Sequence, residues 1–368
     1  MNSLLQLLGQ FGNILQNQLF PVLQEELGPM SNLHQKLVAT LAMLEMDGFV
    51  SVQHGRGRPA HSRTAIARAF VAKAVFGFPH TRALLDRLQI DSVMRRVCGW
   101  ETAAAVPDET IFSRAFGELA RNEMPQRVQA ALIARTQADR LVGHISRDSA
   151  AIEVREKPEP QTKVSKPSPA PRYRRGKKKP KPPEKMTRIE RQCDGSQTLP
   201  QMIAELPRGC DVGCKTNSNG HKYNWVGYKL HLDVADGQIP ISCLLTSASM
   251  HDSQAAVPLA EITAQRVTSL YDLMDKGYES DLIQEHSKKL GHVPIIDRQK
   301  RGRQDNQMAP HEAVRFRERT AVERVYARLK DEFGAGTVRV RGAVKVMAHL
   351  MFGILALTVD QLLRLSPS

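Results

Sequence analysis

The chain has 368 residues, of which 41% are apolar, so it can form two or three domains with a sizeable core. Its formal net charge of +14 suggests a polyanionic partner such as DNA, RNA or an anionic membrane surface. Five cysteines in so long a chain argue against a disulfide framework, and residues 1–27 lack the basic leader of a signal peptide. The longest apolar run, near residues 350–359, is too short for a membrane span and predicts a buried helix. We therefore expect a cytoplasmic protein without a membrane partner.

The first 139 residues have helical patterning throughout. We expect an N-terminal helix within residues 1–30 and an all-α domain over 31–139, with apolar residues at helical spacing in 33–45, 64–75, 81–87 and 111–121. Asp108 or Thr110 can cap the last of these helices. The elements around 84–97 and 111–121 permit a helix-turn-helix that would place Arg114 near DNA, although three-helix packing without nucleic acid gives much the same pattern.

A short arginine-rich motif follows the first predicted helices. In the segment from Gly55 to Pro59, Arg56 and Arg58 alternate with glycine, which resembles the core of an AT-hook. Extended arginines of this kind enter the narrow minor groove of DNA. Four residues match often by chance, so a solvated linker is the first interpretation and a minor-groove contact the second.

Residues 157–220 are predicted to form a basic, Pro-rich insertion that is flexible in isolation. Lys157–Arg191 alone holds 13 Lys or Arg, 3 Glu and 8 Pro, which contribute about +10 of the net charge, and it has few apolar residues with which to form a core. Its cations, including Lys177, Lys178 and Lys179, would bind DNA phosphates with a strong salt dependence. A solvated linker is the alternative.

The insertion separates the first strand of an α/β core, in residues 140–156, from the remainder in 221–368. Asp148 lies in the first strand, or at a bend between two strands. Alternating apolar and polar residues on both sides of Asp236-Gly237 predict a β-hairpin. Asp252 is expected to cap a helix over 254–266.

A short buried strand that ends at Asp275 is predicted within residues 270–278, followed by a helix over 282–290 and another strand over 292–297. Asp233, Asp236 and Asp272 compete with Asp275 as functional carboxylates in this part of the chain. We favour Asp275, because it ends its strand and precedes Gly277, where a side chain can project into a crevice at the carboxyl edge of a sheet.

Residues 311–333 predict an amphipathic helix that carries a line of polar residues beside its apolar stripe. At about 100° per residue, Phe316, Arg319, Glu323 and Lys330 fall within roughly 60° of one another. A Glu and an Arg four residues apart are also common on exposed helices, where each pair contributes only about 0.2–0.5 kcal/mol. Taken alone, this line of residues is explained well by such surface pairing.

Two motifs, taken together, give a more specific resemblance. The spacing Phe-x2-Arg-x3-Glu-x6-Lys closely resembles the Tyr-x2-Arg-x3-Glu-x6-Lys signature of bacterial insertion-sequence transposases of the DDE type, with Phe316 in place of the tyrosine. The run Asp275-Lys276-Gly277-Tyr278 resembles the segment around that family's second catalytic Asp. The resemblance covers about residues 140–365 without the insertion and, more weakly, residues 31–130.

The resemblance implies an RNase H-like fold, in which a mixed sheet is flanked by helices and preceded by an all-α domain. It implies that Asp148, Asp275 and Glu323 are the catalytic carboxylates and hold two Mg²⁺ ions, with Mn²⁺ as a possible substitute. Arg319 and Lys330 would contact DNA or order the site. The Phe316 substitution removes the hydroxyl donor of the family tyrosine.

The resemblance also implies a function. The protein would bind terminal inverted repeats in double-stranded DNA, hydrolyse a phosphodiester at each element end and join the 3′-hydroxyl ends to target DNA. It would act in the nucleoid as a homodimer or higher oligomer, because two ends must be processed together. The alternatives are a non-enzymatic DNA-binding regulator, as a transposase relic, and a metal-dependent nuclease of the same fold.

Overall fold

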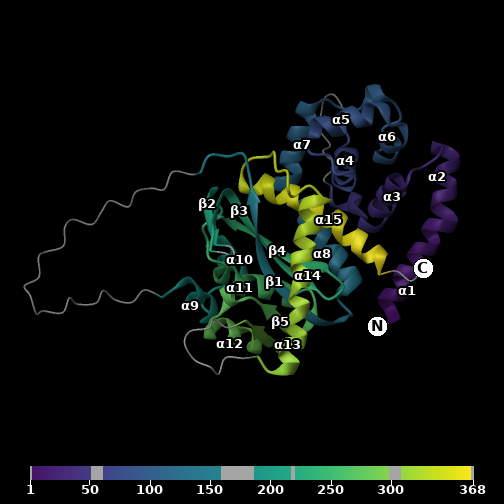
Figure 1. Cartoon of the computed structure of the whole chain (residues 1–368). Helices are drawn as coiled ribbons and strands as arrows, with labels where there is room; N and C mark the ends of the chain where they lie inside the picture. Colours follow the sequence, from purple (N-terminus) through teal and green to yellow (C-terminus); the bar gives the residue numbers. More distant parts are fainter. Residues whose placement is uncertain (1, 51–60, 159–185, 217–219, 298–307, 366–368) are drawn as a thin grey trace, which may run out of the picture.

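The computed structural model describes residues 2–50, 61–158, 186–216, 220–297 and 308–365. The N-terminal helices pack at one end of an α/β core that contains all the strands found in the described residues (Figure 1). The N-terminal helices are α1 (Asn2–Ile14), α2 (Phe20–Leu27), α3 (Asn32–Leu44), α4 (Arg63–Val75), α5 (Thr81–Ile90), α6 (Ser92–Cys98), α7 (Glu109–Arg121) and α8 (Met124–Gln137). The four helices expected between residues 33 and 121 are confirmed as α3, α4, α5 and α7.

Side-chain caps explain where several of these helices begin. Ser62 accepts a hydrogen bond from the Ala65 backbone N–H at the start of α4. Asp108 accepts one from the backbone N–H of Ile111 at 2.9 Å, so its predicted capping role for α7 is confirmed. Asp91 caps α6 in the same way and separates it from α5.

The core is built on a six-stranded mixed sheet. Its strands are β1 (Leu141–Glu153), β2 (Asp211–Thr216), β3 (Lys222–Ala235), β4 (Ile239–Ser247), β5 (Thr268–Met274) and β6 (Val293–Ile296). They lie in the order β2-β3-β1-β5-β6, and β4 also pairs with β3. The β3–β4 hairpin turns at Asp236-Gly237, as the sequence predicts.

β1 is a single strand in the middle of this sheet. It runs antiparallel to β3 and parallel to β5, and Asp148 is aligned with Leu232 of β3. The alternative of a bend at Asp148 is therefore wrong, because the pairing with β3 continues through it. Successive side chains of a strand point to opposite faces, so Arg147 and Asp148 project to different sides of the sheet.

The remaining helices cover the sheet or join it to the N-terminal helices. They are α9 (Arg188–Cys193), α10 (Leu199–Ala204), α11 (Ala256–Ala264), α12 (Asp281–Lys289), α13 (Pro310–Phe316), α14 (Thr320–Asp331) and α15 (Ala343–Arg364). α14 packs on β1 and β3, and α11 packs on β3 and β4. This arrangement of helices on a mixed sheet confirms the expected RNase H-like fold class.

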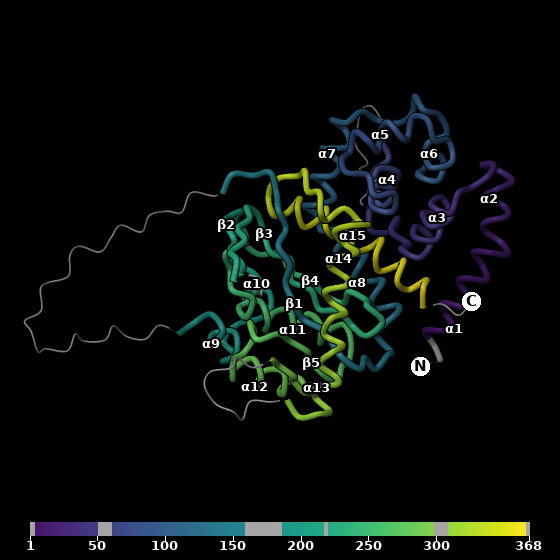
Figure 2. The backbone as a smooth tube through the Cα atoms, in the orientation of Figure 1, coloured from purple at the N-terminus to yellow at the C-terminus, as the bar shows by residue number. Residues whose placement is uncertain are grey.

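α15 connects the two parts of the molecule. Figure 2 shows it running between the N-terminal helices and the core, and it contacts α3, α4, α7, α8 and β4. Phe352 lies with its ring centroid 5.6 Å from that of Phe70 in α4 and 6.2 Å from that of Phe116 in α7. Among the described helices, α15 alone is long and apolar enough to cross a membrane, but 78% of its apolar window is buried inside the protein. The expected buried helix is confirmed.

The expected flexible insertion at 157–220 is too long. Residues 188–216 contribute α9, α10 and β2, and β2 pairs with β3 as part of the sheet. Two features explain this order. Thr187 and Glu190 form a capping box at the start of α9. Met202 and Leu206 are buried, and Leu206 belongs to an apolar cluster with Leu259 of α11.

The single helix expected over 311–333 is in fact two helices. A 3₁₀ turn, η6 (Arg317–Arg319), separates α13 from α14. At this turn the Ser146 hydroxyl of β1 donates a hydrogen bond to the Glu318 carbonyl at 3.2 Å. The backbone group is thus bonded to the sheet, which fixes the start of α14 against β1.

Candidate active site

Asp148 and Asp275 lie where the parallel pairing of β1 with β5 ends, Asp148 within β1 and Asp275 directly after β5. The pairing of β1 with β5 ends at Arg147 opposite Met274, so Asp148 and Asp275 are the next residues along these two neighbouring segments. The Asp275 carboxylate accepts a hydrogen bond from the Gly277 N–H at 2.9 Å. A Cβ atom at Gly277 would lie 2.9 Å from Asp275 Oδ1, so this tight turn favours glycine.

Glu323 is linked to Asp148 through Arg319. Arg319 Nη2 donates to Glu323 Oε1 at 2.6 Å, and its Nη1 lies 3.7 Å from Asp148 Oδ2. The Arg319 guanidinium also lies 5.7 Å from the centre of the Phe316 ring. The structure therefore brings the three predicted carboxylates to one region, with an arginine between two of them.

The environment of Asp148 disfavours its charged form. Burial raises the pKa of this carboxyl to about 6, and the nearby charge of Asp275 adds to the effect, while Arg319 and Lys215 oppose it. Such a shift is common in functional sites. Lys215 lies on β2, inside the segment expected to be a flexible insertion, so sequence reasoning missed its proximity to Asp148.

The donor chemistry of these residues fits a divalent cation, because carboxylate oxygens are the ligands that hard metal ions prefer. Within the described ranges, however, no three His, Cys, Asp or Glu side chains are grouped closely enough to hold one metal ion. Arg319 occupies the position between Asp148 and Glu323. A metal ion shared by these two carboxylates would have to replace the guanidinium there.

The rival carboxylates have structural roles instead. Asp233 is fully buried and accepts two hydrogen bonds from Arg147, on the face of β1 opposite to Asp148. Asp272 is buried and pairs with His292 at 3.2 Å. Asp236, in the hairpin turn, pairs with Arg140 at 2.5 Å.

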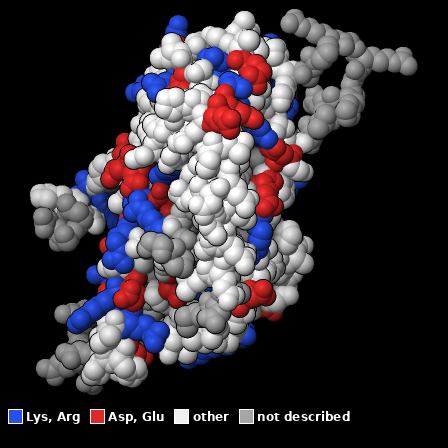
Figure 3. Space-filling model, turned by 90° about the vertical axis from the view of Figure 1, so that its right-hand side faces the viewer, with Lys and Arg blue, Asp and Glu red and all other residues white. Residues whose placement is uncertain are grey.

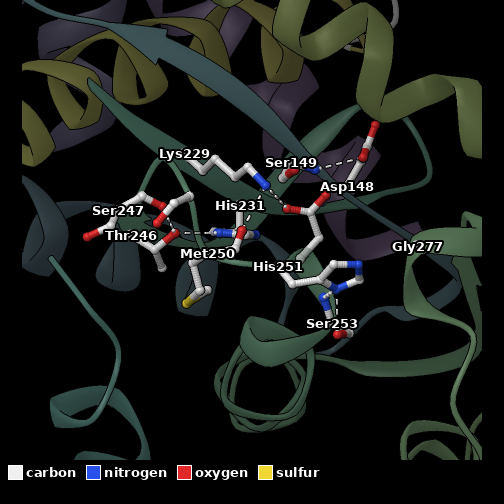
Figure 4. A network of polar contacts seen from close by, with 12 residues as sticks. Asp148, Ser149, Lys229, His231, Thr246, Ser247, Met250, His251, Ser253 and Gly277 are labelled. Carbon is white, nitrogen blue, oxygen red and sulfur yellow. Dashed lines mark hydrogen bonds and ion pairs between the residues drawn. The ribbon is translucent and has the colours of Figure 1, made fainter. Parts of the chain in front are cut away.

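Asp252 does not cap a helix as expected. His251 caps the 3₁₀ turn η4 (Asp252–Ala255), and Asp252 accepts a hydrogen bond from Lys229 Nζ at 2.9 Å. In Figure 4, Lys229 points from β3 toward Ser149, the residue next to Asp148. A hydrogen bond also joins the side chains of Ser149 and Asp252. This network ties β1 and β3 to η4 next to the candidate site.

The predicted DNA-contacting residues are spread over the molecule. Lys330, in α14, is partly buried, and burial lowers its pKa while the charge of Glu153 opposes the shift. Arg114 is exposed on α7. Five further predicted contacts lie outside the described residues: Arg56, Arg58, Lys177, Lys178 and Lys179. Their roles in DNA binding stay predictions.

Comparison with known protein families gives two matches. Residues 207–359 match the model described as "Transposase DDE domain", and residues 24–118 match "Transposase domain (DUF772)". The first match contains Asp275 and Glu323, and it begins ahead of β2. No curated protein and no solved structure matched the chain. The catalytic-domain match and the N-terminal match together establish that this chain belongs to the DDE-type insertion-sequence transposases.

Proposed function

We propose that this transposase binds the terminal inverted repeats of a mobile element, hydrolyses a phosphodiester at each end and transfers the 3′-hydroxyl ends to target DNA. The observation that carries the proposal is the convergence of three carboxylates. Asp148 and Asp275 sit at adjacent positions of neighbouring strands, and Arg319 links Glu323 to Asp148. A site of this kind catalyses phosphoryl transfer by neutralising charge and positioning the reacting groups.

DDE transposase domains generally use divalent metal ions. We propose that Asp148, Asp275 and Glu323 hold two Mg²⁺ ions, replaceable by Mn²⁺, which would activate the attacking oxygen and stabilise the leaving oxygen. Arg319 would leave the two carboxylates and bind a DNA phosphate. Lys330 lies two helical turns beyond Glu323 on α14 and would contact a second phosphate.

The N-terminal helices would supply the contacts to the element ends, with Arg114 of α7 exposed for this purpose.

We propose that two copies act together in the nucleoid, since two ends must be processed in one reaction. A broad strip of uncharged side chains crosses the face shown in Figure 3, where α1 and α2 lie. This segment has no charged residue before Glu25, and Leu5 and Val22 are 44% and 53% exposed.

The test is a cleavage and joining assay. Labelled DNA that carries the flanks of the gene is mixed with a target plasmid, with and without Mg²⁺, for the wild type and for Glu323→Gln. The amide keeps the shape of the side chain but removes its charge. Glu318→Gln is the matched control, because Glu318 is exposed on η6 and its side chain has no ion pair within the described residues.

We expect metal-dependent nicks and joined products from the wild type and from Glu318→Gln, and none from Glu323→Gln. Equal activity of all three proteins would remove Glu323 from the site and contradict the proposal. Nicks without joined products would indicate a nuclease. Specific binding without cleavage by any of the proteins would indicate a DNA-binding regulator.

A further inference from the structure

A cavity of about 290 Å³ lies where the N-terminal helices meet the end of the catalytic core. α4, α5 and α7 form one side of it, and the segment between α14 and α15 together with the first half of α15 forms the other. Phenylalanine rings line its interior, including Phe70, Phe116 and Phe352, and four cations line it as well: Lys73, Arg339, Arg341 and Lys345. The cavity is thus part apolar and part strongly basic.

Lys73 is the most unusual of these cations. Its side chain is on α4, only 9% exposed, with Ala72 and Ala74 as its buried neighbours in the chain. Burial lowers its pKa to about 8, and no carboxylate opposes this shift. In the described part of the chain it forms no ion pair. A buried ammonium group without an anionic partner costs free energy, so an anion entering the cavity would relieve that cost.

The other three cations are also free to bind an anion. Arg339, Arg341 and Lys345 are exposed, and none of them has an ion pair among the described residues. One carboxylate, Glu109, also lines the cavity, at the exposed start of α7. His349 is kept neutral by burial, which lowers its pKa to about 4. Four cations against one carboxylate leave the cavity with an excess of positive charge.

We propose that this cavity binds a phosphate group, with Lys73 as the inner contact and Arg341 and Lys345 as outer contacts. The phosphate is either a backbone phosphate of bound DNA or a free phosphate ion. The first case rests on the proposed function. Lysine and arginine side chains are the usual protein ligands of both. A phosphate bound here contacts the N-terminal helices and the catalytic core at the same time, at a place separate from the three carboxylates.

The experiment compares the full-length wild type with Lys73→Met, which keeps the length of the side chain and removes its charge. Lys288→Met, an exposed position on α12, is the matched control. Thermal unfolding is followed with and without inorganic phosphate, at ionic strength matched by chloride. DNA binding is measured in EDTA over a range of salt concentrations. No cleavage is needed, so failure of the catalytic proposal does not affect the result.

We expect Lys73→Met to reduce the slope of log Kobs against log salt by about one unit, as for the loss of one phosphate contact, while Lys288→Met keeps the wild-type slope. If inorganic phosphate also stabilises the wild type and the control but not Lys73→Met, the cavity accepts free phosphate. A change in the DNA slope alone assigns the cavity to a DNA phosphate.

The proposal is overturned if the slope of log Kobs against log salt is the same in all three proteins and inorganic phosphate changes their thermal stability equally. Lys345→Gln, at an exposed position, serves as a second variant if Lys73→Met does not fold. It is expected to reduce the salt slope of DNA binding, the stabilisation by inorganic phosphate, or both. Wild-type values of both for this variant would likewise overturn the proposal.

Discussion

Removing one partner of the buried ion pair between Arg147 and Asp233 should be among the most destabilising single substitutions in the core. The two side chains are 1% and 0% exposed, and two hydrogen bonds of 2.8 and 2.7 Å join them across β1 and β3. Replacing Arg147 by Met leaves a buried carboxylate without its counter-ion, a change that typically costs 3–5 kcal/mol. The Thr263 hydroxyl still donates to Asp233 at 2.6 Å, so we expect a loss of about 3 kcal/mol.

The free energy of unfolding from equilibrium chemical denaturation measures this loss. The double variant Arg147→Met/Asp233→Leu removes both charges, and we expect it to be more stable than Arg147→Met alone. Arg140→Met breaks the partly exposed pair with Asp236 and should cost no more than about 1 kcal/mol. Equal losses for Arg147→Met and Arg140→Met would refute the reasoning.

Two further predictions concern the sheet. Gly227 has a φ of +152°, and a Cβ atom there would lie 2.1 Å from the Ile152 carbonyl oxygen. Gly227→Ala should therefore separate β1 from β3 and lower the melting temperature of the protein. An unchanged melting temperature would show that the two strands adjust without cost. Although burial opposes it, the hydrogen bond from His292 and the charge of Arg147 lower the pKa of Asp272. The wild type should therefore be more stable than Asp272→Asn above the ordinary aspartate pKa and lose that advantage as the pH falls through the lowered value, which denaturation at several pH values will show. A stability difference between the wild type and Asp272→Asn that persists in strong acid would contradict this prediction.

Local patterns account for the parts of the site that could be predicted. Asp275 is located by a strand end two residues before Gly277, and Glu323 by its spacing from Arg319 and Lys330, so both can be found from residues close to them in the sequence. Asp148 is less distinct in the sequence, because a strand and a turn explain it equally well. Its position in an unbroken β1 depends on pairing with β3, which lies about eighty residues later in the chain.

The contacts that could not be predicted all join distant segments. Lys215 affects Asp148 because β2 extends the sheet next to β3. Asp252 looks like a helix cap in the sequence, since nothing near it reveals that Lys229 lies within 2.9 Å. Likewise, the turn that divides α13 from α14 is stabilised by Ser146, which belongs to another element.

The packing of α15 has a consequence for where the proposed reaction would cut DNA. Because one apolar cluster contains buried residues of α4, α7, α15 and the strands, the N-terminal helices and the catalytic sheet share a single interior. In the proposed reaction, the bases that the helices recognise and the bond that the carboxylates attack are therefore held at a fixed separation. α15 acts as the spacer that sets this separation. Shortening it or making it more flexible would therefore change the position of the cut more readily than the cleavage chemistry itself.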